Sequence, residues 1–156
     1  MPSLLCLLPI LALQSQQLTA TELSLGAAAA FARETFAGAE LGVAHRPNND
    51  SRIALAVGGG VASPDQAAAV RAQLTLQLLL NSSARSGTGL YAGVGGAFFG
   101  AQGAPGRGFV ALVIGVERTP GRRNGWFIES GFGGGVRLAA GWRARRFPSW
   151  WRGGGG

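Results

Sequence analysis

RGFVALVIGVER, residues 107–118, shows the pattern that decides the fold. Its large apolar residues recur at every second position, and Glu117 falls on the opposite parity. The apolar set is Val110, Leu112, Ile114 and Val116. Successive side chains of a β-strand point to opposite faces, so this alternation predicts a strand with one apolar and one polar face.

Seven further segments repeat the alternation, and residues that favour turns separate them, such as Pro47 to Ser51 and Thr119 to Gly121. These segments lie near residues 19–31, 35–46, 52–62, 68–80, 88–100, 126–132 and 136–142. Residues 63–80 also allow a helix, with Ser63 as N-cap and Pro64 as first helical residue. An apolar residue at every second position from Val70 to Leu80 favours a strand.

The charged residues indicate which face of the strands points into the barrel and which points outward. Eight of them lie inside the segments, and all eight fall on the parity opposite to the apolar set: Glu22, Glu40, Arg52, Arg71, Glu117, Glu129, Arg137 and Arg143. The rest of that face is mostly glycine and alanine, which suit a crowded lumen better than a solvated surface. The apolar face has no charge in the middle of any segment, as contact with lipid requires. The sequence therefore predicts an all-β fold, an eight-stranded antiparallel up-and-down transmembrane β-barrel.

Aromatic residues fall near the ends of the apolar rows, where membrane barrels have aromatic girdles. The predicted girdle comprises Phe31, Phe98, Trp126, Phe132 and Trp142.

Composition restricts the classes that remain. The chain has 156 residues, 47% of them apolar and 13% charged, which suits one folded domain and excludes most intrinsic disorder. Cys6 is the single cysteine and His45 the single histidine, so no metal site, disulfide or cofactor is predicted. The net charge of +7 comes entirely from arginine, without lysine. Arginines cluster at two segment ends, at Arg118, Arg122 and Arg123 and at Arg143, Arg145, Arg146 and Arg152. These clusters either contact lipid or lipopolysaccharide phosphates or are solvated turn charges, and nucleic-acid binding is not expected.

The apolar run from Leu4 to Leu13 is too short to span a membrane and resembles the core of a secretory signal peptide. We expect cleavage between Leu13 and Leu18. The predicted organisation is a signal peptide over 1–17, a barrel over 18–147 and a C-terminal tail over 148–156.

Together these features resemble the small eight-stranded outer-membrane β-barrels of Gram-negative bacteria. The resemblance rests on leader, strand count and alternation, covers most of residues 19–147, and brings no catalytic residues with it. It implies an outer-membrane location and recognition of a final aromatic residue, Trp142 or Phe147, by the barrel assembly machinery. It also implies an N-terminus on the inner side, with the loops near 32–34, 63–66, 101–106 and 133–135 facing outward.

The charged lumen has two interpretations. A static plug of Glu–Arg pairs is favoured over a gate or narrow pore, because eight strands leave little open radius. Neighbouring segments suggest the pairs Glu40 with Arg52 and Glu129 with Arg137. No enzymatic activity is predicted, because Pro47 stands where a His-plus-Ser lipid A deacylase motif would need its serine after His45.

Two alternatives to a membrane barrel stay open. A secreted soluble β-barrel that binds an apolar ligand would have the small-residue face outside. The high arginine and glycine content would also suit a GC-rich reading frame that does not encode a folded product, although eight coherent alternations argue against it.

Overall fold

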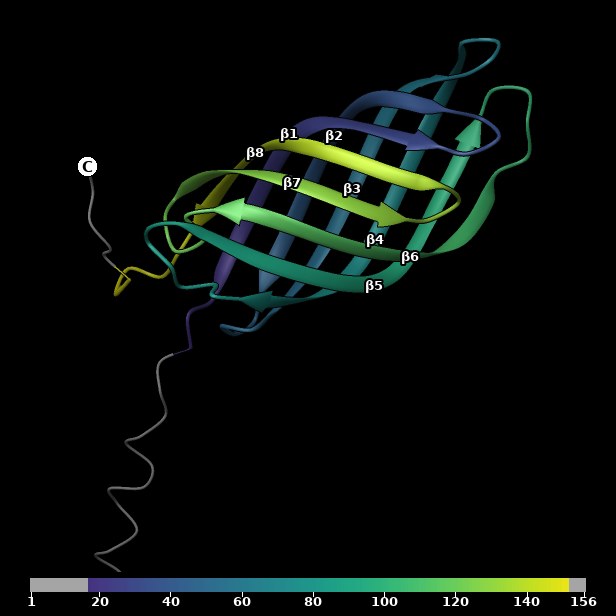
Figure 1. Ribbon diagram of the computed structural model, residues 1–156. Coiled ribbons are helices and arrows are strands. Elements are labelled where there is room, and N and C mark those ends of the chain that lie inside the picture. Colours follow the sequence, from purple (N-terminus) through teal and green to yellow (C-terminus); the bar gives the residue numbers. More distant parts are fainter. Residues whose placement is uncertain (1–16, 152–156) are drawn as a thin grey trace, which may run out of the picture.

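The computed structural model describes residues 17–151 and consists of eight antiparallel strands that close into a barrel (Figure 1). Each strand pairs with its neighbours in the sequence, and β1 closes the barrel against β8. The predicted fold class is confirmed. The strands are β1 (Ala20–Phe31), β2 (Phe36–Arg46), β3 (Ser51–Ala62), β4 (Ala67–Leu80), β5 (Thr88–Ala101), β6 (Arg107–Arg118), β7 (Asn124–Phe132) and β8 (Val136–Arg146).

The segment that could have been a helix is strand β4. It pairs with β3 from Ala62↔Ala67 to Ser51↔Leu78, and its other edge pairs with β5. A helix here would leave backbone groups of two strands without partners, which is costly in a membrane. No helix able to cross a membrane is present within residues 17–151.

The large apolar side chains point outward. Leu78 is 66% exposed and Val110 74% exposed, and each sits in a row of exposed Leu, Val or Ile residues on its strand. On the described strands, charged and histidine side chains of this outer face occur only at row ends, at His45, Arg118 and Arg146. The soluble alternative needed the opposite arrangement, with small residues outside.

Glycine allows the strands to close tightly. Gly38 and Gly60 face each other on β2 and β3, and a Cβ at Gly38 would lie 2.8 Å from the Gly60 Cα. Gly26 and Gly141 make the same approach between β1 and β8, at 3.0 Å. Glycine inside a strand marks such close backbone approaches, which explains why the inner face is rich in this residue.

The two ends of the barrel differ. We call the end where β1 begins and β8 finishes the terminal end; it also carries the connections 47–50, 81–87 and 119–123. The far end carries the connections 32–35, 63–66, 102–106 and 133–135. The predicted signal peptide falls almost wholly on residues 1–16, outside the described residues.

Candidate functional site

The lumen holds two clusters of charged side chains. The first, the terminal-end network, lies near the end where the chain enters and leaves the barrel. Its members are buried: Glu22, Arg46, Arg52, Glu117, Arg143 and Arg145. They come from β1, β2, β3, β6 and β8, so the network ties together strands from around the barrel wall.

Glu117 is the centre of this network. Its Oε1 accepts a hydrogen bond from Arg46 Nη2 at 3.0 Å. Its Oε2 lies 3.1 Å from Arg52 Nη1, 2.6 Å from Arg143 Nη1 and 2.8 Å from Arg145 Nη2. Such a carboxylate with four guanidinium partners holds the network in place by charge-assisted hydrogen bonds.

Glu22 is the second carboxylate of the network. It pairs with Arg46, and its Oε2 lies 3.0 Å from Arg52 Nη1. Arg52 Nε in turn donates to Gln77 Oε1 at 2.8 Å. With two carboxylates and four arginines, the terminal-end network has a net positive charge.

The second cluster, the middle network, lies deeper in the barrel and consists of Glu40, Tyr91, Glu129 and Arg137. Arg137 on β8 forms ion pairs with both Glu129 on β7 and Glu40 on β2. The Tyr91 hydroxyl donates to Glu129 Oε2 at 3.0 Å. Three strands that are not all neighbours are thus joined through one guanidinium.

Aromatic rings fill the space between the two networks. The Arg52 guanidinium carbon lies 4.4 Å from the Tyr91 ring centre, and that of Arg143 lies 4.6 Å from the Phe127 ring centre. Cations over ring faces are attracted by the ring quadrupole. Tyr91 therefore belongs to the middle network through its hydroxyl and contacts the terminal-end network through its ring.

The far end of the lumen is closed differently. Phe36 and Phe99 meet edge to face with ring centres 6.2 Å apart, packed with Ala30, Ala62 and Ala69. Arg71 is 3% exposed and donates from Nη2 to the Gly133 carbonyl at 2.8 Å, which fastens the β7–β8 turn to the lumen.

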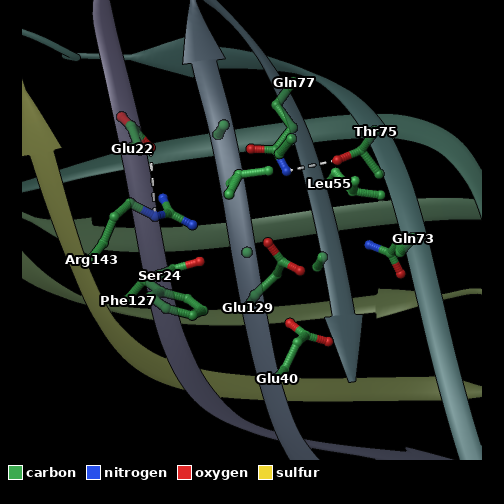
Figure 2. A pocket seen from close by; sticks show the side chains of 15 residues that line it. Glu22, Ser24, Glu40, Leu55, Gln73, Thr75, Gln77, Phe127, Glu129 and Arg143 are labelled. Carbon is green, nitrogen blue, oxygen red and sulfur yellow. Dashed lines mark hydrogen bonds and ion pairs between the residues drawn. The ribbon is translucent and has the colours of Figure 1, made fainter. Parts of the chain in front are cut away.

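Little open space remains between these layers. A cavity of about 30 Å³ lies against the wall formed by β2, β3 and β4. Figure 2 shows Glu22 and Arg143 on one side of it, Glu40 and Glu129 below, and Gln73, Thr75 and Gln77 opposite. This volume has room for a few water molecules.

The eight charged residues singled out in the sequence all lie inside the barrel and are buried. Glu129 does pair with Arg137. The suggested pair Glu40 with Arg52 does not form: Glu40 pairs with Arg137, and Arg52 pairs with Glu22 and Glu117. The closure of the barrel brings these partners together across the lumen. The order of neighbouring segments in the sequence does not predict such contacts.

Three residues of the networks were missed from the sequence. Arg145 belongs to an arginine cluster expected at the rim, and Arg46 is not among the predicted site residues, yet both are buried in the terminal-end network. Tyr91 is also outside the set of predicted site residues. All three share the inward parity of their segments, which is the signal that could have found them. Among residues 17–151 the lumen consequently holds six arginines and four glutamates, not equal numbers.

The predicted girdle residues lie on the outer rows of their strands. Phe31, Phe98 and Phe132 lie toward the far end, and Trp126 and Trp142 toward the terminal end. Four of the five are exposed; Trp126 is half-buried and faces Trp142 across the β7–β8 pair.

The single histidine lies on the outer face. His45 pairs in register with Thr21 and Ile53. Ser51 Oγ donates to Asn48 Oδ1 at 2.9 Å, and the Asp50 backbone NH donates to the same oxygen. These contacts cap the β2–β3 turn, and the histidine takes no part in them.

The closed barrel, apolar outside and charged inside, has the fold of the small eight-stranded outer-membrane barrels. Solved structures that share it include the following three. The N-terminal β-barrel domain of OprF from Pseudomonas aeruginosa has a TM-score of 0.60 and 14% identity, over 83% of this chain and 98% of that one.

The other two structures are similar in coverage. Ail, the attachment invasion locus protein of Yersinia pestis, has a TM-score of 0.50 and 13% identity, over 83% of this chain and 99% of that one. Neisserial surface protein A has a TM-score of 0.51 and 13% identity, over 81% of this chain and 96% of that one. No family model and no curated protein matches the sequence.

Proposed function

We propose that this protein is a non-catalytic outer-membrane barrel whose lumen is closed, so that it acts as a structural element of the membrane and not as a pore. The observation that carries the proposal is the filling of the lumen. Two charged networks, the Tyr91 and Phe127 rings and the Phe36–Phe99 pair occupy it in succession, and the cavity between them is about 30 Å³.

The outer face supports the membrane location. It is a continuous band of Leu, Val, Ile and aromatic side chains whose middle carries no charge on the described strands. Lipid tolerates such a surface and water does not. The shared fold of the outer-membrane barrels points to the same membrane.

The proposed orientation places the terminal end on the periplasmic side, as an exported chain with an N-terminal leader would have it. Outer-membrane lipid and lipopolysaccharide are then the surroundings of the barrel wall. The barrel assembly machinery is the proposed partner during insertion, with Trp142 or Phe147 as the aromatic residue that it recognises.

Two measurements test the proposal. The protein is expected in the outer-membrane fraction, extractable only with detergent and shifted on an unboiled gel; recovery without detergent would overturn the location. In planar bilayers the purified barrel is expected to show no single-channel steps, with a larger porin as positive control. Reproducible conductance steps would overturn the closed lumen and favour the gate interpretation instead.

A further inference from the structure

Exposed charge is distributed unequally between the two ends of the barrel. Among the described residues, the far end balances the exposed Arg33 and Arg107 against the exposed Asp65 and the half-buried Glu34. In the described part of the chain, the terminal end has a single exposed carboxylate, Asp50, against five exposed arginines: Arg85, Arg118, Arg122, Arg123 and Arg146. An anionic partner is therefore favoured at one end only.

Four of these arginines gather on one side, over β6, β7 and β8. Arg118 ends the outer row of β6, and Arg146 ends the outer row of β8. The β6–β7 turn between them carries Arg122 and Arg123, and the Arg123 carbonyl accepts the Arg145 backbone NH at 2.6 Å. None of the four forms a salt bridge within residues 17–151.

Two tryptophans adjoin these arginines on the membrane-facing surface. Trp126 and Trp142 are paired in register, and the pair Glu117↔Phe127 places Arg118 beside Trp126 on the next strand. Arg146 follows Trp142 and Ala144 on the same outer row of β8, two strand repeats beyond Trp142. Tryptophan prefers the depth of the headgroups, so the arginines reach the level of lipid phosphates.

We propose that this surface, formed by Arg118, Arg122, Arg123, Arg146, Trp126 and Trp142, binds the phosphate of an anionic glycerophospholipid. A guanidinium matches phosphate geometry with two parallel hydrogen bonds, and several together select an anionic headgroup over a zwitterionic one. The source follows from orientation: the terminal end meets the periplasmic leaflet, which consists of glycerophospholipid, while lipopolysaccharide fills the opposite leaflet. The inference rests on the proposed function, because it requires the barrel to span the membrane.

The tryptophans themselves provide the assay. The full chain is refolded into vesicles of phosphatidylcholine with brominated acyl chains, which quench nearby tryptophan. Unbrominated phosphatidylglycerol is then added at increasing fractions. Adding any unbrominated lipid dilutes the quencher, so unbrominated phosphatidylcholine gives the reference loss of quenching. If phosphatidylglycerol binds preferentially near the tryptophans, it reduces quenching more than this reference does. We expect an apparent preference of about fivefold or more at low salt, and weaker at 0.5 M salt.

Matched variants locate the effect. The double substitution Arg118→Gln/Arg146→Gln should reduce the preference to about twofold or less. The far-end double substitution Arg33→Gln/Arg107→Gln removes the same charge and should leave the preference unchanged. All variants must show the folded gel shift before comparison.

Several outcomes would overturn the inference. These are no preference for phosphatidylglycerol, a preference that survives Arg118→Gln/Arg146→Gln, or relief by lipid A but not by phosphatidylglycerol, which would assign the surface to lipopolysaccharide. Failure of the proposed function looks different: brominated phosphatidylcholine would then not quench the tryptophans at all.

Discussion

Tyr91 donates its hydroxyl to Glu129 Oε2 at 3.0 Å while its ring lies under the Arg52 guanidinium, 4.4 Å away. A single side chain thus contacts both charged networks of the lumen. A hydroxyl that donates to a buried carboxylate stabilises the folded barrel and satisfies one of the carboxylate oxygens.

Tyr91→Phe keeps the ring and removes only the hydrogen bond. We expect a loss of about 1.5–3 kcal/mol in the free energy of unfolding, because the partner is charged and buried. Denaturant unfolding in detergent, followed by the gel shift, measures it. Tyr91→Leu should cost more, since it also removes the ring from Arg52 and Arg143. Equal stability of wild type and Tyr91→Phe would show that Glu129 is satisfied without the hydroxyl.

Glu129→Gln tests the middle network. Arg137 would retain only Glu40 as a charged partner, and breaking a buried pair in this way costs about 3–5 kcal/mol. Asp65→Asn is the control, because Asp65 is exposed in the β3–β4 connection. The thermal midpoint in detergent should fall for the first variant only. Matching midpoints would mean that Glu129 is solvated and that the lumen is not a plug.

The terminal-end network predicts an order of effects. Glu117→Gln leaves four buried arginines with one carboxylate and is expected to cost about 3–5 kcal/mol. Arg145→Met removes one of the surplus cations and leaves Glu117 with three guanidinium partners, so it should cost clearly less. Arg107→Met, exposed at the far end, serves as the surface reference. A larger loss for Arg145→Met than for Glu117→Gln would contradict the surplus of positive charge.

Much of this architecture could be predicted because a strand has a period of two. That period predicts which residues of each segment face outward and which face inward. It does so even for β4, whose residues also have good helix propensity. Pairing inside the lumen could not be predicted in the same way. Arg137 on β8 reaches Glu40 on β2 because the barrel closes with a particular strand register, which adjacent segments do not encode.

Position along a strand was also misleading for long side chains. Arg46 and Arg145 stand at strand ends, where a charge usually reaches solvent, but both point inward and extend to Glu117. Gly115 carries information that is visible only in three dimensions: a methyl group there would overlap the Tyr91 ring.

That contact makes Gly115→Ala a test of packing in the lumen. Tyr91 is held by Glu129 and Arg52, so overlap with it should cost about 1–3 kcal/mol, as overpacking does elsewhere. Gly59→Ala is the matched control, because a Cβ at Gly59 meets nothing within 4 Å. Urea or guanidinium midpoints of the two variants measure the difference. Indistinguishable midpoints would show that the Tyr91 ring moves aside freely.

The last prediction concerns Trp151, which follows β8 in the sequence. Trp151 Nε1 donates to the Gly121 carbonyl at 3.1 Å, and the Arg85 guanidinium carbon lies 4.5 Å from one of its rings. Trp151 therefore holds the β6–β7 turn, whose Arg122 and Arg123 are exposed sites for trypsin.

Trp151→Ala should loosen this turn and raise the rate of tryptic cleavage after Arg122 or Arg123 several-fold, because cleavage needs local opening. Trp151→Phe retains a ring for Arg85 but has no donor for the Gly121 carbonyl. Its cleavage rate should therefore lie between those of the wild type and Trp151→Ala. Trp150→Ala removes only the edge-to-face contact of Trp150 with Trp151, whose ring centres lie 6.0 Å apart, and should raise the rate less than Trp151→Ala. Cleavage rates that are equal in the Trp151→Ala and wild-type barrels would mean that the turn is held by its own backbone hydrogen bonds, Gly121 to Ala84 and Arg122 to Thr119, without the tail.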